Sequence, residues 1–195
     1  MRLATLSAVA VAILAMAACG PGAPPQAAPA PAKKSALPPP VEVGPPLEPP
    51  APGTPGGLPN DRTPVSEAPF SEKSAQGAAN VVQTYYALIG EKKFAQARRL
   101  WDHGGENSGM AEAAFARSFD VYSEYRGNVG APGDIEGAAG SLYIEIPVQP
   151  YGRLKSGQPE YRIGIARLRR INDVEGSTEE QRRWHIVAIE LKPAA

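Results

Sequence analysis

Apolar residues first recur with a helical period shortly after residue 70. They lie three or four positions apart, which places them on one face of a helix that Ser71 would cap and Gly90 would end. The apolar positions of this helix are Ala78, Val81, Val82, Tyr85, Leu88 and Ile89. The spacing therefore predicts an amphipathic helix at the start of a folded region.

Two shorter helices and then several strands are expected beyond this first helix. The helices are predicted near residues 92–101 and 108–118, where apolar side chains form a single stripe. After Phe119 the period changes to alternation, which is typical of strands with one buried face. The strands are predicted near residues 121–128, 135–137, 142–151, 161–170 and 183–191. Helices followed by strands predict an α+β fold, with three N-terminal helices packed on a curved, mostly antiparallel sheet.

The N-terminal segment has the form of an export signal. Arg2 precedes a mostly apolar run over residues 3–18, which is too short to span a bilayer comfortably and has the length of a signal-peptide core. The run ends in Met16-Ala17-Ala18-Cys19-Gly20, which resembles a bacterial lipobox. In such a motif the cysteine is acylated and becomes the new N-terminus. An ordinary signal peptide cut after Ala17 is the alternative.

Acylation of Cys19 would decide where the protein lies in the cell. Cys19 is the one cysteine of the chain and stands at the position that acylation requires. Two or more acyl chains give stable anchoring, whereas a single chain is marginal. Gly20 follows in place of aspartate, which for this family of signals implies transfer to the outer membrane. We therefore expect a lipid-anchored protein on the periplasmic face of the outer membrane.

Proline dominates the segment between this signal and the first helix. Seventeen of the 22 prolines lie between residues 21 and 69, and no periodic apolar face exists there. Such a segment is expected to be a disordered, extended linker, and fifty residues at about 3.1 Å each would reach at most roughly 150 Å. The predicted division is thus a signal peptide over residues 1–18, an acylated linker over 19–69 and one domain over 70–195.

Charge and composition exclude several classes of function. Lysine plus arginine number 20 and aspartate plus glutamate number 20, so charge does not predict a nucleic-acid partner. A single cysteine excludes an intramolecular disulfide framework, and two histidines without cysteines nearby leave none of the usual zinc-site spacings. No metal and no cofactor are therefore expected.

The opening of the domain resembles that of the nuclear transport factor 2-like superfamily. The resemblance is carried by Tyr85-Tyr86 on the first helix and by the aromatic-x-x-Ala pattern Phe94-Ala95-Gln96-Ala97, followed by Leu100-Trp101. Element order extends the resemblance over residues 75–191, and several turns also look like those of small bacterial envelope lipoproteins. It implies a cone-shaped α+β fold. The fold does not imply one function, because this superfamily contains isomerases, dehydratases, hydrolases and non-enzymatic binding modules.

An enzymatic interpretation rests on few residues. In similar isomerases the first helix contributes a tyrosine to the cone, and Tyr85 matches that position. Asp102 and His103, at the end of the second predicted helix, are candidates for a base and its orienting partner, although a helix-terminating loop explains them as well. The strand that would carry a polarising acid has none, and Glu145 alternates with apolar neighbours and should point away from their face.

A binding function is the main hypothesis. Five aromatic residues are candidates for lining an apolar pocket in the cone, although filling of the core explains them equally well: Tyr85, Trp101, Phe115, Tyr143 and Trp184. The sequence therefore favours a non-enzymatic, membrane-anchored lipoprotein whose domain binds an envelope protein or an apolar ligand. The alternatives are an isomerase, dehydratase or hydrolase that uses Tyr85, Asp102 and His103, and a homodimer that acts as a spacer.

Overall fold

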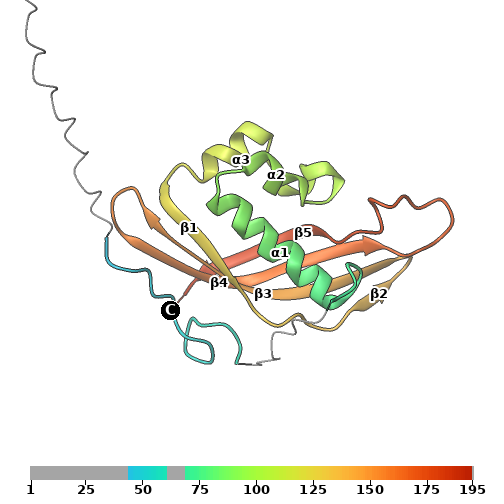
Figure 1. Ribbon diagram of the computed structural model, residues 1–195, viewed down its shortest axis with the longest axis horizontal. Coiled ribbons are helices and arrows are strands. Elements are labelled where there is room, and N and C mark those ends of the chain that lie inside the picture. The colour runs from blue at the N-terminus through green and yellow to red at the C-terminus, as the bar shows by residue number, and fades with distance from the viewer. Residues whose placement is uncertain (1–43, 61–68, 195) are drawn as a thin grey trace, which may run out of the picture. The chain divides into compact units, whose positions relative to one another are not determined.

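The structure is a computed structural model that describes residues 44–60 and 69–194. The elements of this part follow the predicted order, helices first and strands afterwards (Figure 1). They are α1 (Ala75–Gly90), α2 (Phe94–Arg99), the 3₁₀ helix η1 (His103–Ser108), α3 (Glu112–Ser118), β1 (Tyr122–Val129), β2 (Glu136–Ala138), β3 (Ser141–Leu154), β4 (Pro159–Ile171) and β5 (His185–Pro193). The predicted α+β class is confirmed.

The sheet is antiparallel, with the strand order β1-β3-β4-β5, and β2 pairs with the start of β3. The long strands β3 and β4 form its centre. Their register places Glu145 opposite Arg167, and the two side chains form an ion pair of 2.6 Å in which both are exposed. Glu145 therefore points away from its buried neighbours Ile144 and Ile146, as the alternation predicted.

The helices lie over one face of this sheet (Figure 1). The buried face of α1 contributes Val82, Tyr85, Tyr86 and Ile89 to a single core. The sheet contributes alternate residues of its three longest strands, which are Ile144, Ile146 and Val148 of β3, Ala166 and Leu168 of β4, and Ile186 of β5. The apolar face of the helix and the apolar face of the sheet thus pack against each other in one core layer.

The start of α1 differs from the prediction. Ser74, not Ser71, is the N-cap, and its hydroxyl oxygen accepts a hydrogen bond of 3.1 Å from the Gly77 amide. The same hydroxyl donates to the Ser71 carbonyl at 2.6 Å, which fixes the turn before the helix. The Ser74 carbonyl accepts a further bond of 3.1 Å from the indole of Trp184. A contact from the residue just before β5 therefore helps to decide which serine caps the helix.

Part of the proline-rich segment lies against the domain, and we refer to residues 44–60 as the strap. The Gln149 side chain donates from Nε2 to the carbonyls of Pro50 and Gly56 at 2.8 and 3.1 Å. Arg153 donates to the Pro45 carbonyl, and Leu58 is 6% exposed. Because Gln149 alternates with the buried residues of β3, the strap covers the sheet face opposite the helices.

The strap differs from the expectation of a linker without contacts. Proline restricts its own backbone and has no amide hydrogen, so a proline-rich segment leaves carbonyls available as acceptors. In the strap, the side chains of Gln149 and Arg153 on β3 donate to the carbonyls of Pro50 and Pro45. Residues 1–43 and 61–68, which include the predicted signal peptide, Cys19 and the rest of the linker, lie outside the described residues. The described part of the compact unit therefore begins well before residue 70.

Candidate functional site

An apolar cavity of about 260 Å³ opens between the helices and β5. We refer to it as the apolar cavity. Its lining comes from α1, η1, α3, β1, β5 and the segments between them, and consists of Tyr85, Tyr86, Trp101, Ser108, Met110, Phe115, Ser118, Phe119, Tyr125, Ile189 and Leu191. The structure thus brings together three of the five predicted pocket residues, namely Tyr85, Trp101 and Phe115.

These three aromatic side chains form one wall by edge-to-face packing. The ring of Tyr85 lies 6.2 Å from that of Trp101 and 6.5 Å from that of Phe115, with interplanar angles of 75° and 62°. All three are buried. Burial raises the pKa of the Tyr85 hydroxyl far above its usual range, so this group stays neutral and protonated.

The apolar cavity offers little polar chemistry. No aspartate, glutamate or histidine occurs among the described residues that line it. The hydroxyls of Ser108 and Ser118 donate to the carbonyls of Gly105 and Phe115, both at 2.7 Å. The indole Nε1 of Trp101 is buried and forms no hydrogen bond of normal geometry in the described part of the chain, but it acts on the Tyr85 hydroxyl and partly offsets the rise of its pKa. The cavity therefore has aromatic walls and, in its described lining, no group that takes up a proton at neutral pH.

Tyr143 and Trp184 lie away from this cavity. Tyr143 lines a separate hollow with Glu145 and Arg167 on the other face of the sheet. Trp184 is 2% exposed, and its ring lies under the guanidinium of Arg170 at 5.8 Å. Because its indole donates to the carbonyl of the α1 N-cap, Trp184 joins the sheet to the helix start and leaves no face for a ligand.

Asp102 and His103 line a different, polar cleft of about 250 Å³. Asp102 caps η1, accepts from the His103 amide at 2.9 Å and forms an ion pair of 3.2 Å with Arg169. The His103 side chain is 62% exposed, and its Nδ1 lies 3.8 Å from the Asp102 carboxylate. Tyr85 does not line this cleft, so the three candidate catalytic residues do not share one site.

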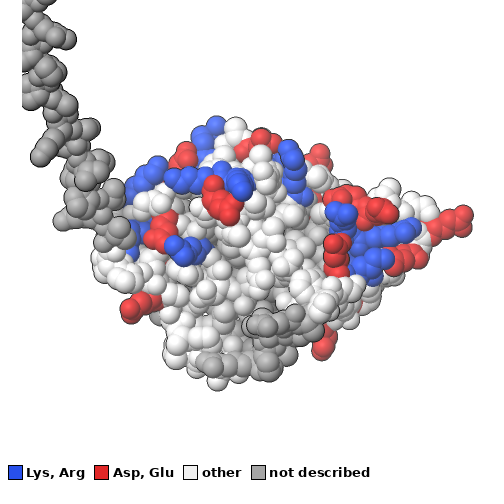
Figure 2. All heavy atoms as spheres, in the orientation of Figure 1, with Lys and Arg blue, Asp and Glu red and all other residues white. Residues whose placement is uncertain are grey.

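His185 also lines the polar cleft and has acceptors at both ring nitrogens. Nε2 lies 2.9 Å from a carboxylate oxygen of Glu180, and Nδ1 lies 3.1 Å from the Arg183 carbonyl. Both ring nitrogens of this strand histidine therefore have a hydrogen-bond partner. In the neighbouring loop between β4 and β5, Asp173 pairs with Lys73 at 2.6 Å and lies 3.5 Å from Arg170. Figure 2 shows acidic and basic side chains intermixed at this end of the molecule.

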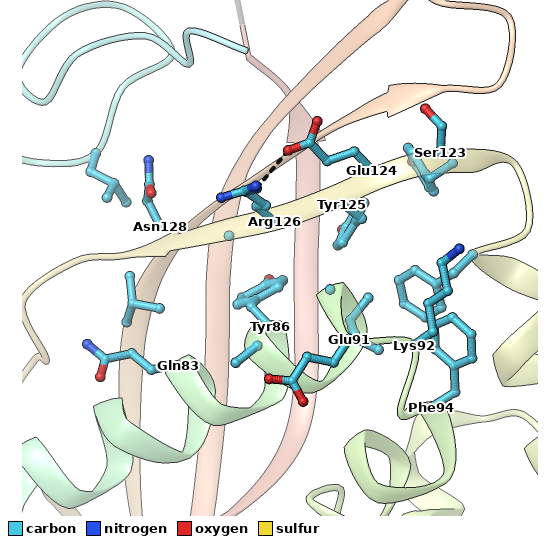
Figure 3. A pocket seen from close by; sticks show the side chains of 18 of the residues that line it. Gln83, Tyr86, Glu91, Lys92, Phe94, Ser123, Glu124, Tyr125, Arg126 and Asn128 are labelled. Carbon is cyan, nitrogen blue, oxygen red and sulfur yellow. Dashed lines mark hydrogen bonds and ion pairs between the residues drawn. The ribbon is translucent and has the colours of Figure 1, made fainter. Parts of the chain in front are cut away.

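A larger hollow than either of these was not predicted from the sequence. It is a groove of about 790 Å³ between α1 and β1, which we call the aromatic groove (Figure 3). It is lined by Pro52 and Leu58 of the strap, Gln83, Tyr86, Ala87, residues 89–92 and Phe94 on one side, and Phe119 and residues 122–129 on the other. The sequence indicated this groove only through its aromatic residues, the doublet Tyr85-Tyr86 and the pair Tyr122 and Tyr125. Nothing in the sequence showed that β1 is an edge strand.

Two further features bear on function. In the described residues, no helix is long and apolar enough to cross a bilayer. Nor does that part of the chain hold a group of three histidine, cysteine, aspartate or glutamate side chains arranged to bind a metal ion.

Comparisons with known proteins give fold similarity alone. No protein-family model matches the sequence, and no curated protein matches it. Among solved structures, the Kfla4162 protein from Kribbella flavida is 13% identical with a TM-score of 0.46, over 64% of this chain and 94% of that one. Aln2 from a Streptomyces species is 13% identical with a TM-score of 0.42, over 64% and 93%. A nuclear transport factor 2 (NTF2-like) superfamily protein from Salmonella enterica serovar Typhimurium is also similar, with 13% identity and a TM-score of 0.44, over 62% and 91%.

Proposed function

We propose that this protein is a non-enzymatic, membrane-anchored periplasmic lipoprotein whose domain binds a small apolar ligand. The observation that carries the proposal is the apolar cavity, which has aromatic walls and no acid or histidine in its described lining. General acid–base chemistry requires a group that exchanges a proton near neutral pH. Tyr85 does not supply one, because burial raises its pKa further from neutrality.

The shape of the cavity narrows the ligand class. Its volume of about 260 Å³ is slightly below the usual range for drug-sized ligands, so the ligand is small or only partly enclosed. Met110 lies at the cavity and is 44% exposed, which marks the side from which a ligand enters. An unbranched acyl chain of medium length fits such a site, because it buries apolar surface and asks for few hydrogen bonds.

Anchoring places the domain where such ligands occur. The lipobox-like sequence ends at Cys19, and acyl chains on this cysteine would hold the protein at the outer membrane, as Gly20 implies. The cell envelope is rich in fatty acyl groups. The enzymatic alternative has no supporting observation, because Tyr85 lines the apolar cavity while Asp102 and His103 line the polar cleft.

Calorimetric titration with decanoate tests the proposed ligand class. Met110→Trp places a large side chain at the opening of the cavity, and we expect it to weaken decanoate binding by about tenfold or more, as loss of about 1.4 kcal/mol would. Val174→Trp is the matched control, since Val174 is 48% exposed and does not line the cavity. It should bind like the wild type. Absence of binding to the wild type, or equal binding by all three proteins with equal thermal stability, would contradict the proposal.

A further inference from the structure

The strap contacts the sheet through two donor side chains of β3. Gln149 donates from its side-chain amide to the carbonyls of Pro50 and Gly56. Arg153, further along the same strand, donates to the carbonyl of Pro45. All three acceptors are main-chain carbonyls, so these contacts recognise the path of the strap's backbone and not particular side chains of the strap.

The domain itself holds both donors in place. The side-chain oxygen of Gln149 accepts from the amide of Asn128 at 3.0 Å. Nη1 of Arg153 donates to the carbonyl of Gly157, in the turn between β3 and β4, at 3.2 Å. Neither contact involves the strap. Donors that are already oriented lose little entropy when a segment binds to them, so this sheet face is a preorganised site.

The spacing of the two donors fits an extended segment. Gln149 and Arg153 lie four residues apart on β3, which corresponds to about 13 Å along the strand. Two of the carbonyls that they bind, those of Pro50 and Pro45, lie five residues apart, or about 15 Å in polyproline II geometry. The strap therefore runs extended and antiparallel to β3. Proline-rich segments suit such a path, because they are extended before they bind and have few main-chain N–H groups that need an acceptor.

The strap has few contacts besides these. Within the described residues, its hydrogen bonds from main chain to main chain stay inside the strap, so it adds no strand to the sheet. The amide of Glu48 donates to the Tyr161 hydroxyl at 3.3 Å, which is a weak contact. Leu58 is the one buried residue of the strap, and it does not belong to the core of the domain. A segment with so few buried contacts opens far more readily than the core does.

We propose that the sheet face beneath the strap is a docking site for an extended, proline-rich segment of a partner protein, and that the strap occupies this site until such a segment displaces it. The chemistry of the partner follows from the strap, since the same donors already hold one proline-rich segment by its carbonyls. The strap is thus an autoinhibitory contact. This inference does not depend on the apolar ligand proposed above.

A different protein is a better occupant than a second copy of this chain. The strap of a second copy makes the same contacts as the tethered strap, which its covalent connection holds at an effective concentration on the order of millimolar. A partner therefore needs contacts that the strap lacks. Leu58 lines the aromatic groove, and a Cβ atom at Gly130, just beyond β1, would lie 3.5 Å from it. A segment that displaces Leu58 gains access to this groove.

Competition with a synthetic strap tests the proposal. The probe is a peptide of residues 44–60 with a fluorophore at its N-terminus, and the protein is a chain that begins at Gly20 and so contains the whole described part. Fluorescence anisotropy measures binding. Because the tethered strap competes with the probe, the wild type should bind the probe with an apparent dissociation constant on the order of millimolar.

A variant with a weakened strap should bind the probe more tightly. This released-strap variant combines five substitutions, all outside the core of the domain: Pro45→Gly, Pro46→Gly, Pro49→Gly, Pro50→Gly and Leu58→Ser. Without its competitor, the site should bind the probe with a dissociation constant lower by about tenfold or more. The matched control is a probe that carries the same five substitutions, and it should not bind. A thermal melt establishes that the domain of the variant is folded.

A further substitution assigns the binding to the donors on β3. Gln149→Ala in the released-strap variant removes the amide that binds two carbonyls, so it should raise the dissociation constant of the probe by about tenfold. Gln96→Ala in the same variant should leave it unchanged, since Gln96 is an exposed residue of α2.

Three results would overturn the proposal. Equal affinity of the wild type and the released-strap variant for the probe would show that the strap does not occupy the site. Equal binding with and without Gln149→Ala would place the probe elsewhere on the protein. Sedimentation analysis identifies the remaining occupant, because wild-type dimers that dissociate when unlabelled probe is added would show that a second copy, and not a different protein, supplies the segment.

Discussion

At the scale of single residues, the structure depends on polar groups whose partners lie far away in the sequence. Gln149 is 1% exposed although its position in β3 alternates with the buried residues. The pattern alone predicts a solvent-facing side chain there, because the strap that covers it comes about a hundred residues earlier. Tyr86 shows the same limit. The sequence placed Tyr85 and not Tyr86 on the apolar face of the first helix, whereas both are buried, and it gave no sign that the Tyr86 hydroxyl has no partner among the described residues.

Gln149→Ala should release the strap. The substitution leaves the carbonyls of Pro50 and Gly56 without their donor and the Asn128 amide without its acceptor, and we expect the free energy of unfolding to fall by about 1–3 kcal/mol. Limited proteolysis with thermolysin should then cut near Leu58, which is buried in the wild type.

The control for this substitution is Gln96→Ala. Gln96 is an exposed residue of α2, so the same change in chemistry should leave both stability and the proteolytic pattern as they are in the wild type. If Gln149→Ala protein resists thermolysin at the strap as the wild type does, the side chain does not hold the strap in place.

At the scale of secondary structure, periodicity predicted which elements exist, and tertiary contacts decided where they begin. The predicted strand over residues 161–170 becomes β4 (Pro159–Ile171), because alternation persists up to the turns at both ends. The short helix η1 was predicted as a polar loop. His103 and the glycines 104 and 105 have positive φ angles there, and such a conformation leaves no periodic apolar signal to detect.

Ser74→Ala tests the observed start of α1. The hydroxyl of Ser74 accepts from the Gly77 amide, and loss of an N-cap oxygen should lower the free energy of unfolding by about 1 kcal/mol. Ser71→Ala is the control, because Ser71 is exposed and its side chain only accepts a weak bond of 3.3 Å from the Lys73 amide. Chemical denaturation of both variants measures the difference. A larger loss for Ser71→Ala than for Ser74→Ala would restore the helix start that the sequence predicted.

At the scale of the whole molecule, the order of helices and strands was sufficient to predict the fold class. The sites depend instead on where the helices lie over the sheet and on which face of the sheet each side chain points to. Three of the five aromatic residues predicted for a pocket do meet, because Tyr85, Trp101 and Phe115 lie on helices and turns over the same part of the sheet. Tyr143 does not join them, since the pleat turns it to the other face. The sequence showed that side chains alternate along this strand, but it did not show which of the two sets faces the helices.

The strap also changes the expected distance between anchor and domain. If the chain is anchored at Cys19 and held by the domain from Gly44 onward, some 24 residues connect them, and at about 3.1 Å each they reach at most roughly 75 Å. This is about half of the reach expected for an unattached proline-rich segment that extends to residue 69.

Cys19→Ser tests the anchor on which this geometry depends. The serine hydroxyl cannot replace the thiol that is acylated, so the variant should incorporate no labelled fatty acid and should leave the membrane fraction, because a domain without acyl chains loses the apolar surface that holds it there. Met16→Leu, which restores the commoner lipobox residue, is the control and should be labelled at least as well as the wild type. An ordinary signal peptide cut after Ala17 makes the opposite prediction. In that case wild type and Cys19→Ser would both be released without label, and equal behaviour of the two proteins would exclude the lipoprotein.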